Sequence, residues 1–456
     1  MVMAPPSIVP AIAGGPVEDR RPSVVVLLAD DAGWSDFGFQ GSTGFETPSL
    51  DRLASQGLVL DACYVTASVC SPSRAGLITG RHQQRFGHEY NLPGTAPRSE
   101  GGLPPDERTI ADRLQDVGYV TGLVGKWHLG LDDAFLPTRR GFDEFRGLRA
   151  GSRSYFGNLK LEGSDRAWER IDAHGHASTP ESEVEYVTDL IATESVDFIR
   201  RHRAHPFLLV ASFTAPHTPM HALSADLDAV PTDLGPERRR TCAAMTIALD
   251  RACGRIIEAV EATGRDSIVV FLGDNGGATN NGSDNGPWRG MKGSHFEGGI
   301  RVPGIWWSSG SRTGRIRQPV SVLDIDATIL GIAGADVQGL DGVDLTPWIE
   351  EERTDRPRRR LHWRRGPVAT IRDGDLKAIR VEGRHTLLFD LARDPGETED
   401  LAGERPGEVV NLLARLAAWE REMTEPAWTT GNRWRDNLLR KHDLSVLGRD
   451  AERRLP

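Results

Sequence analysis

The sequence contains few cysteines for its length. Only 4 cysteines occur among 456 residues, and two of them, Cys242 and Cys253, share a stretch that is typical of one helix. At about 1.5 Å per residue they would be roughly 16 Å apart, which is too far for a disulfide bond. The composition therefore excludes the disulfide-built scaffold of small secreted domains.

Long apolar runs and an excess of basic residues are also missing. No apolar run approaches the ~20 residues that cross a bilayer, so no membrane partner is expected. The net charge of -10 argues against a nucleic-acid partner, although a local basic cluster can still bind an anion. Residues 1–22 lack the basic start of a secretory signal and are interpreted as a disordered leader. We expect a cytoplasmic location, or a periplasmic or secreted one if a native leader has been removed.

Strand-like and helix-like segments alternate through most of the chain. Residues 23–30 (SVVVLLAD) form a continuous β-branched run, which is typical of a strand buried on both faces. Similar runs occur at residues 206–213 (PFLLVASF) and 267–273 (SIVVFLG), with helical patterns between them. This order predicts an α/β fold with a large, mostly parallel central sheet flanked by helices.

The pattern changes near residue 340. Short alternating segments, broken by Asp-Gly and Glu-Gly, indicate antiparallel hairpins there, and a helix rich in Leu and Ala follows them. We therefore predict a large α/β domain at residues 23–345. A smaller α+β subdomain at residues 346–456 would contain an antiparallel sheet, a helix and an arginine-rich tail.

Hard oxygen ligands follow two of the predicted strands. Asp30 and Asp31 end the first, and Asp274 and Asn275 end another. Parallel strands present their carboxyl ends at one edge of a sheet, where ligands bind. Carboxylate and amide oxygens there would suit Ca²⁺ or Mg²⁺. The alternative interpretation is that Asp and Asn follow strands because they favour turns.

Cys70 differs from the other cysteines in its surroundings. It begins the segment CSPSRAGLITGR, in which Pro72 and the run after it predict a helix that starts at or near Cys70. The free N–H groups of a helix start favour negative charge. Arg74, four residues on, would lie on the same helix face and could grip an oxyanion. On its own, a Cys near an Arg is also compatible with a structural or merely reactive thiol.

The same segment resembles the sulfatase signature Cys-x-Pro-Ser-Arg with its Thr-Gly-Arg ending, with no departure at the core positions. On this resemblance the chain is identified as a member of the type I, formylglycine-dependent sulfatase family in the alkaline-phosphatase-like superfamily, resembling arylsulfatases and N-acetylgalactosamine-6-sulfatases. Further segments similar to the family occur in order along residues 24–345, one before the signature and the others after it: LADDAGW, GKWHLG, RGFDEFRG, TAPHTPMH, GDNGG and GMKGSHFEGGIRVP. A looser similarity continues through LLFDLARDPGETEDLA.

The resemblance implies that residues 23–345 are the catalytic domain of a sulfuric ester hydrolase. Its substrates would be sulfate monoesters, either aryl sulfates or, as we expect physiologically, sulfated carbohydrates. The implied catalytic residues are Cys70, Arg74, Lys126, His128, His217 and Lys292. The implied metal ligands are Asp30, Asp31, Cys70, Asp274 and Asn275, holding Ca²⁺ with Mg²⁺ as the alternative.

The family mechanism implies a modified nucleophile. A formylglycine-generating enzyme would convert Cys70 to formylglycine, whose hydrated aldehyde attacks sulfur. His217, together with Lys292, would protonate the departing alcohol, and His128 would help the second hydroxyl to expel sulfate. The remaining histidines without such support are treated as structural or substrate-facing, among them His82, His88, His221 and His295.

Two rival functions remain open from the sequence. One is a phosphonate monoester or phosphodiester hydrolase of the same superfamily, and the other is a silent homologue that binds sulfated glycans with an unmodified Cys70. Substrate selectivity is expected in the loops at 151–157, 217–221 and 280–288, which contain residues suited to hydrogen bonding and stacking on a sugar. The oligomeric state is not readable from the sequence.

Overall fold

The computed structural model describes residue 19 and residues 21–42, 44–92, 101–158, 167–178, 183–184, 186–355 and 360–443. Most of the expected leader and the tail beyond residue 443 lie outside these residues. No described helix has the length and apolar character needed to span a membrane. No disulfide bond joins any of the four cysteines, all of which lie in the described residues, and this agrees with the expected absence of a disulfide-built scaffold.

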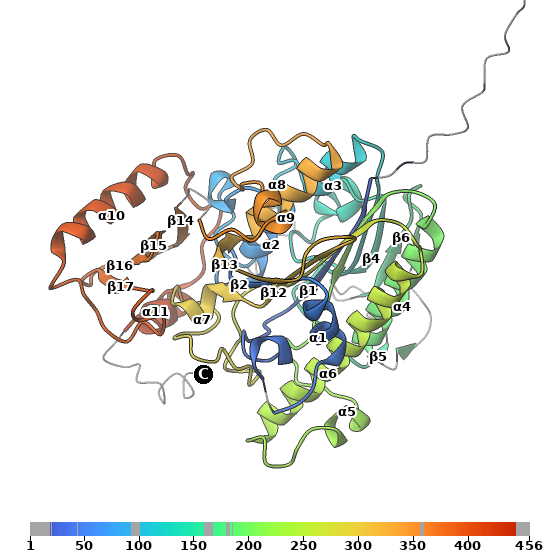
Figure 1. Ribbon diagram of the computed structural model, residues 1–456, viewed down its shortest axis with the longest axis horizontal. Coiled ribbons are helices and arrows are strands. Elements are labelled where there is room, and N and C mark those ends of the chain that lie inside the picture. Colours follow the sequence, from blue (N-terminus) through green and yellow to red (C-terminus); the bar gives the residue numbers. More distant parts are fainter. Residues whose placement is uncertain are drawn as a thin grey trace, which may run out of the picture.

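A mixed β-sheet forms the centre of the molecule (Figure 1). Its strands are β1 (Ser23–Ala29), β2 (Leu58–Tyr64), β3 (Val120–Lys126), β4 (Glu144–Leu148), β6 (Glu169–Ile171), β7 (Ala177–Ser178), β9 (Phe207–Ser212), β10 (Ser267–Gly273), β11 (Arg301–Val302), β12 (Gly304–Ser308) and β13 (Gly314–Ser321). Their order is β11-β2-β12-β10-β1-β9-β3-β4-β6-β7, with β13 beside β2. The central strands β10, β1, β9, β3 and β4 are parallel, and antiparallel strands extend the sheet at both sides. The α/β class is confirmed.

Helices cover both faces of this sheet (Figure 1). The helices of one face are α1 (Pro48–Ser55), α4 (Val187–His202) and α6 (Glu237–Glu261), and those of the other face are α2 (Cys70–Thr79), α3 (Ile110–Gln115) and α8 (Val322–Ala333). Shorter elements are α5 (Ser224–Asp228), α7 (Glu297–Ile300), α9 (Thr346–Glu350) and the paired strands β5 (Gly157–Asn158) and β8 (Glu183–Val184).

Strand β1 contributes to both hydrophobic cores. Val24, Val26 and Leu28 pack into the core on the α2 and α8 side, whereas Val25 and Leu27 pack into the core on the α4 and α6 side. Successive side chains of a strand point to opposite faces, so a strand covered on both sides must be apolar throughout. This explains the unbroken run at residues 23–29.

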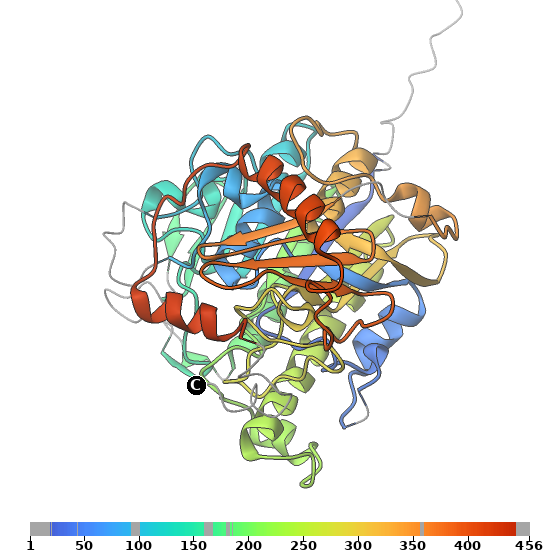
Figure 2. The same cartoon turned by 90° about the vertical axis from the view of Figure 1, so that its left-hand side faces the viewer.

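A separate antiparallel sheet follows the large one (Figure 2). Its strands are β14 (Leu361–Arg365), β15 (Val368–Asp373), β16 (Leu376–Val381) and β17 (Leu387–Asp390), paired in chain order. The helix α10 (Pro406–Glu420) packs on it, and α11 (Asn432–Arg440) follows. The expected hairpins and helix are confirmed, whereas the division of the chain at residue 345 stays a prediction.

A buried ion cluster joins the two sheets. Lys377 of β16 is fully buried, and its Nζ lies 2.9 Å from Glu297 Oε1 and 2.8 Å from Glu397 Oε1. Glu297, in α7, also accepts a hydrogen bond of 2.5 Å from the hydroxyl of Tyr64 in β2. One lysine therefore holds carboxylates from both parts of the chain.

We expect Lys377→Met to lower the free energy of unfolding by about 3–5 kcal/mol, because it removes the cation from the buried Glu397 and the nearest cation from the buried Glu297. Urea denaturation followed by circular dichroism measures this loss. The control is Arg415→Gln, which breaks an exposed ion pair with Asp373 and should change stability by less than about 1 kcal/mol. If the two variants were equally stable, the cluster would not be what holds the sheets together.

Candidate active site

The parallel pairing of β1 with β10 brings the two predicted acidic segments together. Ala29 is opposite Gly273 in the register, so the residues after each strand are neighbours. Asp274 Oδ1 accepts a hydrogen bond of 3.1 Å from the Asp31 N–H, and Asn275 Nδ2 donates one of 2.8 Å to Asp31 Oδ1. The expected convergence at one sheet edge is confirmed.

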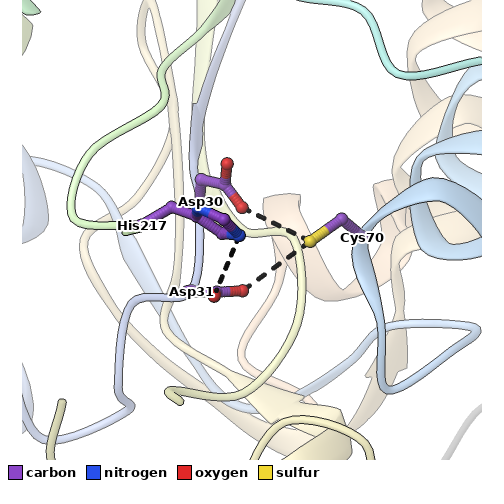
Figure 3. Close-up of side chains that lie close together, drawn as sticks. All are labelled: Asp30, Asp31, Cys70 and His217. Atoms are coloured by element: carbon purple, nitrogen blue, oxygen red, sulfur yellow. Dashed lines mark hydrogen bonds and ion pairs between the residues drawn. The ribbon is translucent and has the colours of Figure 1, made fainter. Parts of the chain in front are cut away.

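Helix α2 carries Cys70 to the same edge. The helix begins at Cys70, as predicted, and the thiol is buried. Its Sγ lies 3.5 Å from Asp30 Oδ1 and 3.7 Å from Asp31 Oδ1 (Figure 3). Burial raises the pKa of the Cys70 thiol well above its usual range, and nearby Asp274 raises it further. An unmodified thiol here is neutral rather than an activated thiolate.

Arg74 is buried one helical turn after Cys70. Its Nε donates 2.9 Å to Asp274 Oδ2, and its Nη1 donates 2.6 Å to the hydroxyl of Ser212, the last residue of β9. Burial, followed by the neighbouring Asp30, raises the pKa of Asp274 to about 6 although Arg74 opposes the shift. The Arg74 guanidinium thus contacts carboxylates of the protein itself. That it also binds an oxyanion of the substrate stays a prediction.

Two lysines complete the ion pairs of the site. Lys126 Nζ, fully buried at the end of β3, lies 2.7 Å from Asp30 Oδ2. Lys292 Nζ lies 2.7 Å from the Asp31 carboxylate and 3.1 Å from Cys70 Sγ. Burial alone would raise the pKa of Asp31, but Lys292 holds it well below its usual range. Both predicted lysines therefore lie beside the acidic residues, with Lys292 against the nucleophile position.

His217 reaches the cluster from the loop after β9. Its Nδ1 lies 2.6 Å from the Thr218 carbonyl and its Nε2 lies 3.6 Å from Asp31 Oδ2 (Figure 3). Burial lowers the pKa of His217 to about 4, so the ring is neutral near pH 7. A carbonyl only accepts, which assigns the proton to Nδ1 and leaves the Nε2 lone pair facing a carboxylate. This lone pair is therefore able to accept a proton.

His128 lies at the margin of this cluster. Burial, followed by Lys126 and Arg74, holds the pKa of His128 well below its usual value. Strand β3 ends at Lys126 and His128 has a φ of 63°, so the extended backbone does not continue through His128. The rule that strand residues two apart share a face therefore does not apply to Lys126 and His128. Asp31 also has a left-handed φ, of 61°. Such strain in non-glycine residues is typical of functional sites.

Some residues that position the site were not predicted. Ser283 Oγ and Asn281 Nδ2 both donate to the Asp31 carbonyl, at 2.8 and 3.1 Å, and thereby support its backbone. Ser212 holds Arg74 as described. Asn281 and Ser283 fall within the loop 280–288 that the sequence suggested for substrate selectivity, but no motif distinguishes them.

A cavity of about 940 Å³ lies beside these loops. Met220, three residues after His217, forms one wall, while Thr279 and Asn280 form another. Residues from both the 217–221 and 280–288 loops therefore border this cavity, together with residues 234–239, whereas the charged residues of the site do not line it. The third loop, 151–157, contributes Gly151, over which the His128 ring packs.

Two of the remaining histidines are held in hydrogen bonds away from the acidic cluster. His88 Nε2 lies 2.7 Å from Ser71 Oγ, and His295 Nδ1 lies 3.0 Å from Thr370 Oγ1. Both rings are buried. These contacts agree with the structural interpretation of His88 and His295.

Comparisons with known proteins agree with this geometry. The sulfatase family model matches residues 22–335. The chain is 33% identical to N-acetylgalactosamine-6-sulfatase of Homo sapiens, over 90% of this chain and 87% of that protein. It is 32% identical to arylsulfatase A of Homo sapiens, over 91% and 90%. Among solved structures, Ps i-CgsB superposes with a TM-score of 0.83 at 30% identity and covers 95% of this chain and 99% of its own. The same protein in complex with k-i-k-neocarrahexaose gives 0.82.

Proposed function

The chain belongs to the sulfatase family and is a sulfuric ester hydrolase, and we propose that it cleaves sulfate monoesters of carbohydrates with a formylglycine at position 70 and a divalent cation. The observation that carries the proposal is the contact of the Cys70 side chain with Asp30, Asp31 and Lys292 at one sheet edge. The carbohydrate preference is supported by the similarity to Ps i-CgsB, which has been crystallised with an oligosaccharide.

The residues present fit a hard cation. Donor atoms of Asp30, Asp31, Cys70 and His217 all lie within 4.8 Å of one another. Asn275 Oδ1 is buried beside them and has no hydrogen-bond partner among the described residues. Oxygen donors favour Ca²⁺, with Mg²⁺ as the alternative. When bound, the cation would polarise the sulfate and lower the pKa of the nucleophilic hydroxyl.

The nucleophile position supports the modification. A formylglycine there would supply a hydrated aldehyde, in which one hydroxyl attacks sulfur and the other allows sulfate to leave without attack by water. Lys126 and Lys292, which lie beside Asp30 and Cys70 respectively, would neutralise the sulfate oxygens as the nucleophile approaches. Arg74 fixes Asp274 and thereby the edge of the site.

The proton transfers of the reaction are assigned to His217, Lys292 and His128. His217 Nε2, which is unprotonated in the neutral ring, would take up the proton that the attacking hydroxyl loses and pass it to the departing alcohol oxygen, with the Lys292 ammonium as a second donor. His128 would accept the proton of the second hydroxyl, since burial and the surrounding cations keep its pKa low and its ring neutral.

The activity is tested with purified protein whose aldehyde content at residue 70 is measured by peptide mass spectrometry. We expect 4-nitrophenyl sulfate and sulfated monosaccharides to be hydrolysed faster than a phosphodiester or phosphonate monoester. Faster turnover of the phosphorus esters would assign the chain to the rival chemistry of the superfamily.

Cys70→Ser should release at most one equivalent of alcohol per protein and retain a covalent sulfo group, because a serine ester lacks the second hydroxyl. Burst kinetics and intact mass measure both. Cys70→Ala is the matched control and should be inert, with an unchanged mass. Steady multiple turnover by the Ser variant would contradict the role of the aldehyde.

Ca²⁺ should stabilise the folded protein by about 2.7 kcal/mol at a hundredfold excess over its Kd. Urea denaturation with Ca²⁺ and with a chelator measures this difference. Asp31→Asn should remove most of the stabilisation, whereas Asp172→Asn, at an exposed position, should keep it. Equal stabilisation of both variants would place the cation elsewhere.

A further inference from the structure

Two basic side chains from the C-terminal part of the chain meet beside the nucleophile position. Arg365 ends β14 and Lys441 follows α11, which lies next to α7 (Figure 1). An ideal Cβ built on Gly293 would lie 3.0 Å from Lys441 Nζ and 3.4 Å from Arg365 Nη1. Both cations therefore approach the backbone next to Lys292, and Lys441 Nζ also donates to the Lys292 carbonyl.

No described carboxylate neutralises these cations. Arg365 is only 7% exposed, its Nε is buried without a partner, and no hydrogen bond or ion pair joins its side chain to a described residue. Its neighbour Arg364 shows the ordinary arrangement, with an ion pair to Glu89. An unpaired buried charge is costly, so a site that keeps one is suited to an anion from outside the chain.

The electrostatics agree with an anion site at this place. Burial lowers the pKa of Arg365 to about 10, and only Tyr90 and the Cys70 thiol oppose the shift. Burial, followed by Arg365 and Lys292, lowers the pKa of Lys441 to about 8. Arg365 thus disfavours the charged form of Lys441, and only Asp31 opposes that shift in pKa. An anion bound between the two side chains would stabilise both charges.

The catalytic centre does not itself need these charges. Asp30, Asp31 and Asp274 are balanced by Arg74, Lys126 and Lys292. The proposed divalent cation already exceeds the single negative charge of a sulfate monoester. The positive charges of Arg365 and Lys441 are therefore available to attract a second anionic group on the same substrate.

We propose that Arg365 and Lys441 form a subsite that binds a second sulfate group of a multiply sulfated saccharide. The inference rests on the proposed function and narrows its substrate class. The planar guanidinium of arginine can donate two parallel N–H groups to two oxygens of a sulfate, which makes Arg365 the principal contact and Lys441 a point charge beside it.

The test compares saccharides that differ by one sulfate. N-acetylgalactosamine 4,6-disulfate is paired with the 6-sulfate, and glucosamine 2-N,6-O-disulfate with its 6-sulfate. We expect wild type to prefer the disulfated member of at least one pair in kcat/KM. Arg365→Gln should lower kcat/KM for that member by about 10- to 100-fold, which is the weight of a charged hydrogen bond. Activity on 4-nitrophenyl sulfate should change less than about threefold.

Three variants control this comparison. Lys441→Gln should reduce the same preference, and Arg365→Lys should restore part of it because it keeps the charge. Arg393→Gln removes an exposed arginine from the same part of the chain and should leave the preference unchanged. An equal loss on 4-nitrophenyl sulfate would assign Arg365 to the cleaved sulfate and overturn the subsite.

Calorimetry with Cys70→Ala protein separates this inference from the proposed function. The disulfated saccharide should bind more tightly than the monosulfated one, and Arg365→Gln should remove the difference. If 4-nitrophenyl sulfate is hydrolysed but no pair shows the difference, the subsite is wrong and the function stands. If no ester is hydrolysed, the function fails, and the binding difference still decides the subsite.

Discussion

The register between β1 and β10 is the constraint on which the site depends. Because Ala29 lies opposite Gly273, Asp30 and Asp274 follow their strands side by side. Leu28 lies opposite Ser212, so β9 ends at the same edge of the sheet. A shift of one residue would turn every side chain of β1 to the other face, away from its core. The two hydrophobic cores that fix this register therefore also fix the distances among the acidic residues.

Those acidic residues in turn require the cations around them. Three buried carboxylates within one edge would repel one another strongly in a medium of low dielectric constant. Lys126 and Lys292 each face one of them, and Arg74 spans two. The left-handed backbone of Asp31 is held by hydrogen bonds from Asn281 and Ser283. The ion pairs thus offset the cost of burying the carboxylates, and the two hydrogen bonds support the strained backbone of Asp31.

Local patterns predicted the elements that present the site. The apolar runs of β1, β9 and β10 and the helix start at Cys70 are each encoded within a few residues. The lysines and His217 were found only through segments that resemble a family, because a lone basic residue has no distinctive pattern. The turn at His128 was not predicted, since a left-handed φ in a non-glycine residue depends on tertiary contacts.

Arg365 and Lys441 escaped prediction for a further reason. They belong to elements that follow Lys292 by many residues, and only the docking of the small sheet brings them to Gly293. Lys377 links the two sheets, and its buried partners include Glu297, five residues after Lys292. The same short segment therefore carries a residue of the active site, the anchor of the second sheet and the glycine that admits two cations. The proposed substrate subsite and the contact between the two sheets therefore depend on the same short segment of the chain.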